Sequence, residues 1–196
     1  MALLPDRLDA EAVQLRRWDP RYAEGLCDAV AGSLPELRPW MPWAQAEPSV
    51  AEHIELLTDG HAKFEAGTEW QFVLLDPDDG RVVGAAGLHH RHGPDIVEIG
   101  YWVRTDTTHR GYATMASRAL TTAAFTHLDY VDEVEIRMDA GNHRSAAVPP
   151  RLGFRHTGEV EQEIDAPGQC GTWLAWRMDR ATWEESGRAA SDGSTG

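Results

Sequence analysis

Small residues and cations meet at one place in the sequence, between a run typical of a strand and a run typical of a helix. Gly111 and Ala113 stand two positions apart there, directly after His109 and Arg110. Backbone N–H groups at the start of a helix have no partner inside the helix, and together with the helix dipole they attract anions. A phosphate can approach them only where the side chains are small. The pattern fits a phosphate-binding turn, although Gly111 by itself fits an ordinary turn equally well.

A second candidate for chemistry is the histidine-rich segment 89–92, which reads His-His-Arg-His. Neighbouring residues of a strand point to opposite faces of a sheet, and no cysteine or carboxylate is spaced with these histidines as metal sites require. The chain has two cysteines, Cys27 and Cys170, too few for a disulfide framework or a zinc site, and they fit a reducing compartment. We therefore expect no metal ion.

Length and charge limit the classes of function. The chain has 196 residues, enough for one domain with its own core, and a formal net charge of -14. This acidity disfavours nucleic acid and favours a cationic partner or substrate, although an acidic surface that only faces water fits equally well. No apolar run approaches the ~20 residues that cross a membrane, and no secretory signal is evident. We expect a cytoplasmic protein without membrane contact.

Strand and helix patterns alternate along the chain and indicate which elements would hold these residues. Apolar runs and alternation predict strands at 12–18, 69–76, 81–90, 95–103, 132–140, 154–162 and 172–180. Helical spacing predicts helices at 19–32, 49–67, 112–128 and 142–148, with Asp19 and Ser49 as the first two N-caps. The proline-rich segment 33–49 fits a structured loop, and 186–196 fits a disordered tail. This order predicts a mixed α/β sheet with helical crossovers.

Several of these segments together resemble the GCN5-related N-acetyltransferase (GNAT) superfamily, and within it the RimJ/RimL-like branch of ribosomal-protein N-terminal acetyltransferases. The matching runs are EIGYWV, HRGYAT, ALTTAAF, NHRS and RLGF, with LRRWDP and LRPWMPW nearer the start. The resemblance covers about residues 12 to 185. It implies the GNAT fold, a mixed and mostly antiparallel sheet of about six or seven strands flanked by helices. It also implies one domain over residues 1–185 and acetyl-CoA as the acetyl donor.

The resemblance places the donor along two segments. The pyrophosphate would lie over His109, Arg110, Gly111, Tyr112, Ala113 and Thr114, and the pantetheine beside the main chain of Tyr101, Trp102 and Val103. The family has Gln or Arg at the first position of this loop, where the chain has Thr108, so the loop keeps a hydroxyl and loses a charge. His109 and Arg110 could compensate. Asn142 would cap its helix or contact the pantetheine amide.

Acetyl transfer to an amine needs a neutral amine, a polarised thioester carbonyl and a stabilised leaving thiolate. At pH 7 about one lysine side chain in 2,500 is neutral, against roughly one-tenth of α-amino groups, so an α-amine needs little help from a base. The resemblance makes Glu98 the candidate base, and His89 or His90 could serve instead. A strand glutamate that faces solvent is the alternative for Glu98.

The group that meets the leaving thiolate is harder to assign. Many relatives have a tyrosine acid at the position of Pro149, so that acid is absent here. The resemblance to the RimJ/RimL-like branch points to Ser145 instead, although Ser145 also fits as a small helix residue. A proline inside a helix removes a hydrogen bond and clashes with the preceding turn, so Pro149 and Pro150 predict a break near Ala147. That break puts catalytic competence in question.

The acceptor site would lie beside the proline-rich loop. The resemblance puts Trp40 and Trp43 over the cleft, with His90 nearby, although both tryptophans also fit as loop-to-core packing. The leading hypothesis is acetylation of the α-amino group of a protein or peptide. A small-molecule amine, such as an antibiotic, a polyamine or an aminoacyl compound, is the alternative acceptor. A non-catalytic acyl-CoA-binding module is a third possibility, and a homodimer is possible.

Overall fold

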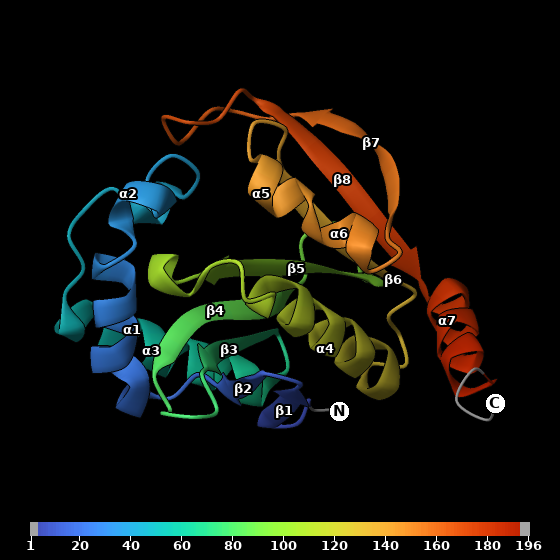
Figure 1. The fold of residues 1–196 in the computed structure, drawn as a ribbon, viewed down its shortest axis with the longest axis horizontal. Helices are drawn as coiled ribbons and strands as arrows, with labels where there is room; N and C mark the ends of the chain where they lie inside the picture. The colour runs from blue at the N-terminus through green and yellow to red at the C-terminus, as the bar shows by residue number, and fades with distance from the viewer. Residues whose placement is uncertain (1–3, 193–196) are drawn as a thin grey trace.

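One eight-stranded sheet forms the centre of the computed structural model, which describes residues 4–192 (Figure 1). The strand order is β1-β2-β3-β4-β5-β6-β8-β7. The strands are β1 (Arg7–Ala10), β2 (Val13–Arg17), β3 (Glu69–Leu75), β4 (Val82–His89), β5 (Ile96–Val103), β6 (Glu133–Asp139), β7 (Arg155–Glu161) and β8 (Thr172–Asp179). The predicted α/β fold with a mostly antiparallel sheet is confirmed. The additional strand is β1, whose four residues are too few to show an alternating pattern.

Helices cover both faces of the sheet. The helix α4 (Tyr112–His127) lies across β1, β2, β4 and β5 on one face, while α1 (Ala23–Ala31) and α3 (Val50–Ala66) lie against β4 and β3 on the other. Each face buries its own apolar cluster, the larger one beneath α4. Since side chains alternate along a strand, β3, β4 and β5 contribute to both clusters.

The alternation along β5 decides which residues share a face. Val97 and Ile99 pack in the cluster beneath α4, and Tyr101 packs against the same cluster. Glu98, Gly100 and Trp102 therefore point to the opposite face, where Trp102 packs against the cluster of α1 and α3. The sequence alone left the orientation of Glu98 open, and the register places it on the α1 side.

The sheet opens between β5 and β6. These strands form the one parallel pair within residues 4–192, and their pairing covers only Ile96–Glu98 against Glu133–Glu135. Beyond that point β5 stays paired with β4 to Val103 and β6 stays paired with β8 to Asp139. The helices α5 (His143–Ala146) and α6 (Val148–Arg151) follow β6 and lie at the opening (Figure 1). Residues 99–103 of β5 therefore have no partner on β6.

Local signals set the starts of two helices as the sequence predicts. The Asp19 carboxylate accepts a hydrogen bond from the Arg21 amide at 3.0 Å, at the start of the 3-10 helix η1 (Pro20–Tyr22) that leads into α1. The Ser49 hydroxyl accepts one from the Glu52 amide at 3.2 Å and donates to the Glu52 carboxylate at 2.7 Å. Such caps satisfy backbone donors that the helix itself leaves open.

Two segments differ from the sequence-based expectation. The segment 33–49 contains two short helices, α2 (Leu34–Leu37) and η2 (Pro42–Ala44), because proline is tolerated in the first turn of a helix. The helix α7 (Arg180–Asp192) extends past Ser186 into the tail that the sequence predicts to be disordered. Residues 193–196 of that tail lie outside the described residues. Another short helix, η3 (Thr105–Thr107), links β5 to α4. Within residues 4–192, no helix has the length and apolar character needed to cross a membrane.

Candidate functional site

The turn before α4 has the geometry of an anion site. Gly111 caps α4 with a φ of 81°, a left-handed conformation that favours glycine, and His109 also has a positive φ of 65°. The first hydrogen bond of the helix runs from the Met115 amide to the Gly111 carbonyl at 3.0 Å. The amides of Tyr112, Ala113 and Thr114 precede it, so in this part of the described chain they have no acceptor within the helix.

Side chains next to this turn anchor it to β3. The Tyr112 hydroxyl donates to the buried Asp76 carboxylate at 3.0 Å, and the Arg110 guanidinium lies 3.5 Å from the same carboxylate. Hydrogen bonding from the Asp78 amide, followed by that from Tyr112, holds the pKa of Asp76 below its ordinary value. Tyr112 therefore contributes a buried side chain to the fold, and only its backbone N–H faces the predicted phosphate site. The Thr108 hydroxyl donates to the Thr105 carbonyl at 2.9 Å, within the turn itself.

The prolines divide the helix after β6 as predicted. The helix α5 ends at Ala146 and α6 begins at Val148, with Ala147 as the residue between them. Asn142 caps α5, because its side-chain oxygen accepts a hydrogen bond from the Ser145 amide at 3.2 Å. This contact shows the helix-cap role of Asn142, and its contact to the pantetheine amide stays a prediction.

Ser145 contacts Tyr101 across the opening between β5 and α5. The Tyr101 hydroxyl lies 3.0 Å from the Ser145 hydroxyl oxygen and 3.1 Å from the Ser145 carbonyl oxygen. Burial raises the pKa of Tyr101 to about 12, against a smaller opposing effect of the bond to Ser145. The phenol therefore stays protonated at neutral pH. The sequence suggested only the main chain of Tyr101 for the site, and the side chain joins it through the fold.

Glu98 is 6% exposed and lies in a charged cluster at the paired ends of β5 and β6. Arg91 Nη1 lies 2.8 Å from Glu98 Oε1, and His92 Nε2 lies 2.8 Å from Glu98 Oε2. His92 Nε2 also lies 3.6 Å from Glu135 Oε1. The expectation that no carboxylate accompanies the histidine segment is therefore wrong for His92. The hairpin between β4 and β5 returns His92 to the strand that carries Glu98, which residue spacing does not reveal.

Guanidinium groups already neutralise these carboxylates. Arg137 Nε lies 2.6 Å from Glu135 Oε1, and Arg177 contacts both Glu135 and Glu133. With Arg91 on Glu98, three arginines face three carboxylates, so a divalent cation would add two uncompensated charges to a mostly buried cluster. His92, Glu98 and Glu135 have the atoms to hold a cation. The arginine contacts favour an ion-pair network over a metal site at these residues.

The other two histidines of the segment have different surroundings. His89 pairs with Glu98 in the register of β4 and β5, and its Nδ1 lies 3.7 Å from Glu69. Burial, followed by the charge of Arg91, lowers the pKa of His89. His90 instead stacks on Tyr130 and lies 5.5 Å from the Trp70 ring. His89 therefore shares the face of Glu98, and the contacts of His90 do not join it to Trp40 or Trp43.

Two loops meet above the opening of the sheet. The Gly168 amide donates to the Pro39 carbonyl at 2.8 Å, and the Gln169 side-chain amide donates to the Trp40 carbonyl at 3.2 Å. A Cβ at Gly168 would lie only 2.6 Å from Pro39, so the close approach depends on glycine. The loop between β7 and β8 thus binds the loop after α2. Sequence reasoning missed this contact, because the two loops lie far apart along the chain.

The two predicted tryptophans of the acceptor site occupy different environments. The Trp40 ring lies near Gly141, at 3.5 Å from where a Cβ would stand, at the end of β6. Trp43 is 53% exposed, and its ring centroid lies 6.0 Å from that of Trp102 on β5. Both tryptophans flank the opening from the side of the proline-rich loop. Trp40 lies at the end of β6 and Trp43 lies beside β5.

Asp139 holds the base of the β7–β8 loop, a role that the sequence did not suggest. Its carboxylate accepts hydrogen bonds from the amides of Gly141, Cys170 and Gly171 and from the Cys170 thiol, at 2.8 to 3.2 Å. Burial opposes the charged form, yet these bonds keep the pKa of Asp139 below its ordinary value. The sequence offered one signal for this role: Asp139 stands at the end of a predicted strand, two residues before Gly141.

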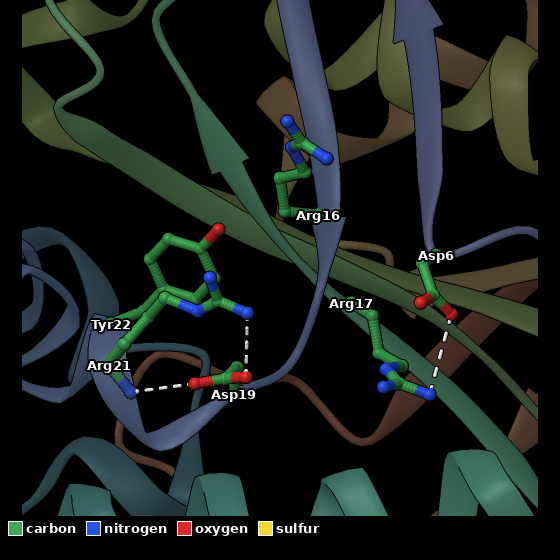
Figure 2. Close-up of a pocket in the computed structure, with 6 residues that line it drawn as sticks. All are labelled: Asp6, Arg16, Arg17, Asp19, Arg21 and Tyr22. Atoms are coloured by element: carbon green, nitrogen blue, oxygen red, sulfur yellow. Dashed lines mark hydrogen bonds and ion pairs between the residues drawn. The ribbon is translucent and has the colours of Figure 1, made fainter.

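A separate polar hollow lies far along the sheet, at the ends of β1 and β2 (Figure 2). Asp6, Arg16, Arg17, Asp19, Arg21 and Tyr22 line it. Arg21 pairs with Asp19 at 2.9 Å, and Arg17 lies 3.4 Å from Asp6 and also pairs with Glu65. The lining has three arginines and two carboxylates, and Glu65 beside Arg17 brings the hollow close to neutral. None of its lining residues belongs to the predicted site.

The sequence has clear relatives. It matches the family described as the acetyltransferase (GNAT) domain over residues 13–155. It is 27% identical, over 89% of this chain and 94% of the relative, to the Bacillus subtilis (strain 168) protein named "Putative ribosomal N-acetyltransferase YdaF".

Solved structures share the fold over nearly their whole length. The structure of Mycobacterium smegmatis RimJ in complex with CoA-disulfide is 24% identical, with a TM-score of 0.77 and coverage of 93% of both chains. The RimL ribosomal L7/L12 alpha-N-protein acetyltransferase in complex with coenzyme A is 17% identical, with a TM-score of 0.79 over 92% of this chain and 99% of that one. The predicted family resemblance is confirmed, and the chain belongs to the GNAT acetyltransferases, with its similarities in the RimJ/RimL-like branch.

Proposed function

We propose that the protein transfers the acetyl group of acetyl-CoA to the α-amino group of a protein or peptide. The observation that carries this proposal is the opening between β5 and β6 next to the free amides of the first turn of α4. The opening offers unpaired strand edges to an amide-containing chain, and the helix start offers N–H donors to a diphosphate.

The donor fits these two features in one extended pose. The pyrophosphate would accept hydrogen bonds from the amides of residues 111–114, with His109 and Arg110 beside it. The pantetheine amides would pair with the free edge of β5 at residues 101–103, which no β6 residue occupies. The thioester would then lie beside α5, where Ser145 and the Tyr101 hydroxyl are in contact.

The acceptor would approach from the opposite face, which carries Glu98. A neutral amine attacks the acetyl carbon, the C–S bond breaks, and its electron pair leaves with the sulfur as a thiolate. The proton released by the nitrogen passes through water to Glu98 and then to solvent. Glu98 is held in place by Arg91 and His92, and buried His89 on the same face is an alternative acceptor for this proton.

The contact between the two loops supports an α-amine as acceptor. The bonds from Gly168 to Pro39 and from Gln169 to Trp40 join the two rims of the opening. A slender, extended chain end can pass beneath such a bridge more easily than a lysine presented on a folded surface. An α-amine is also far more often neutral at pH 7 than a lysine side chain. The names of the relatives, as ribosomal or α-N-protein acetyltransferases, agree with this acceptor.

The test has two parts. Isothermal calorimetry measures the affinity for acetyl-CoA, and a thiol-release assay then compares peptides with free N-termini, the same peptides with blocked N-termini but a free lysine, and small amines. We expect release only with free N-termini. Release with small amines alone would move the acceptor to a small molecule. Binding of acetyl-CoA without release on any amine would leave a non-catalytic acyl-CoA-binding protein.

A further inference from the structure

Pro149 removes the usual helical donor to the Ser145 carbonyl, in the middle of the site. In a continuous helix the amide of residue 149 would donate to the carbonyl of residue 145, but proline has no N–H. The Ser145 carbonyl therefore lacks this bond, and the Tyr101 hydroxyl lies 3.1 Å from it. The same phenol lies 3.0 Å from the Ser145 hydroxyl oxygen. The break at Ala147 thus allows a β5 side chain to approach the Ser145 hydroxyl.

We propose that Tyr101 is a positioning residue that directs the Ser145 hydroxyl toward the leaving sulfur of CoA. This inference rests on the proposed function. It assigns the Tyr101 side chain of β5 a role beside Ser145, in a site that has proline and no tyrosine at position 149. Tyr101 touches Ser145 and acts through it. Ser145 is the group that meets the thiolate.

The hydrogen-bond geometry allows one arrangement that serves the reaction. A phenol has one proton to donate, and a serine hydroxyl can donate one proton and accept others. When Tyr101 donates to Ser145 Oγ, the Ser145 proton is free to point at the sulfur. The Ser145 carbonyl keeps a contact from the Ala147 amide in that arrangement. Among the described residues the Ser145 hydroxyl has Tyr101 as its hydrogen-bond partner, so without the phenol the Ser145 proton can turn to other acceptors.

The pair acts as a hydrogen-bond donor and keeps both of its protons. Burial raises the pKa of Tyr101 to about 12, well above the ~8.5 of an ordinary thiol, so transfer of the phenol proton to a thiolate is unfavourable. The electron pair of the broken C–S bond stays on sulfur, stabilised by the bond from Ser145. The proton balance is completed by the amine nitrogen, which loses its proton toward Glu98.

The thiol of bound CoA reports this interaction without any acceptor. The ultraviolet absorbance of the thiolate, followed against pH, gives the thiol pKa of CoA on wild-type protein, Tyr101→Phe, Ser145→Ala and the double variant. We expect the lowest thiol pKa on wild-type protein and a higher one on each variant, with the double variant equal to Ser145→Ala. CoA lacking its sulfur should bind wild-type protein and Tyr101→Phe equally, because the remaining contacts are unchanged.

Rates give a second measurement. Single-turnover acetylation should be slower by about tenfold in Tyr101→Phe, with an unchanged KM for acetyl-CoA, since one bond to a developing charge is weakened. Tyr22→Phe, at the distant polar hollow, is the matched control and should match wild-type protein. Ser145→Thr keeps the hydroxyl and should retain most of the rate. This variant tests the need for a hydroxyl at position 145 even if Tyr101→Phe is unstable.

Equal thiol pKa values on wild-type protein and Tyr101→Phe would overturn the inference, as would additive effects of the two substitutions. Wild-type protein that lowers the thiol pKa of CoA yet acetylates no amine would contradict the proposed function and leave this inference standing.

Discussion

The Tyr101 hydroxyl lies 3.1 Å from the Ser145 carbonyl oxygen and 3.0 Å from the Ser145 hydroxyl oxygen, at a position where an amide four residues later would otherwise donate to the carbonyl. The absence of a tyrosine at position 149 and the break in the helix after Ser145 are therefore linked. The chain has a proline at the position where the family resemblance implies a tyrosine acid, and the same proline opens the Ser145 carbonyl to a tyrosine from β5. The break in the helix at Ala147 is compatible with an ordered catalytic site.

Glu98→Gln should slow acetyl transfer mainly below about pH 8. The α-amino group has a pKa of ~7.7–8.0, and above that pH it is mostly neutral without help from a base. We expect the kcat of the variant to fall about tenfold or more near pH 7 and to approach that of wild-type protein at high pH. Glu133→Gln, which changes another carboxylate of the ion-pair cluster, is the matched control. A variant with the wild-type pH profile would remove Glu98 from the role of base.

Gly111→Ala should weaken CoA binding and reduce stability. The position has a φ of 81°, and a Cβ there would lie 3.2 Å from the end of the Met115 side chain. A left-handed non-glycine residue costs about 1–2 kcal/mol, which the turn can avoid only by changing its shape. Gly80→Ala tests strain alone, since Gly80 has a φ of 72° with no atom within 4 Å of a Cβ. Calorimetry should show reduced CoA affinity in Gly111→Ala and wild-type affinity in Gly80→Ala.

His89 should make folding stability depend on pH below neutrality. Burial, followed by the charge of Arg91, lowers the pKa of His89 in the folded protein, so the unfolded chain binds this proton more readily. This contribution to stability is complete above the unfolded pKa of ~6.5 and is lost as pH falls toward the folded value. Urea unfolding of wild-type protein and His89→Gln, between about pH 5 and pH 8, should show a smaller loss in the variant. Parallel curves would contradict this assignment.

Gln169→Ala should raise the KM for peptide acceptors while the KM for acetyl-CoA stays unchanged. The substitution removes the bond from the Gln169 side chain to the Trp40 carbonyl and loosens the bridge between the two rims. We expect an effect of about 3- to 10-fold, the size of one neutral hydrogen bond. Gln162→Ala, on the same loop, is the control. Equal acceptor KM values in both variants would place the bridge outside the acceptor path.

The sequence was sufficient for features that depend on near neighbours along the chain. Gly111 before a helix, the Asp19 and Ser49 caps and the break at Ala147 were all predictable, because each depends on backbone conformation or bonding within about four residues. The resemblance to known acetyltransferases added the fold. The strand β1 escaped prediction because four residues cannot establish a period.

The tertiary structure decided which side chains meet. The divergence of β5 from β6 after Glu98 creates the opening, and strand register alone sets where it begins. The hairpin after β4 brings His92 to Glu98, and the break after α5 lets Tyr101 reach Ser145. These contacts join residues on different elements, and their geometry follows from how the elements pack against one another. Composition and spacing contain no information about that packing.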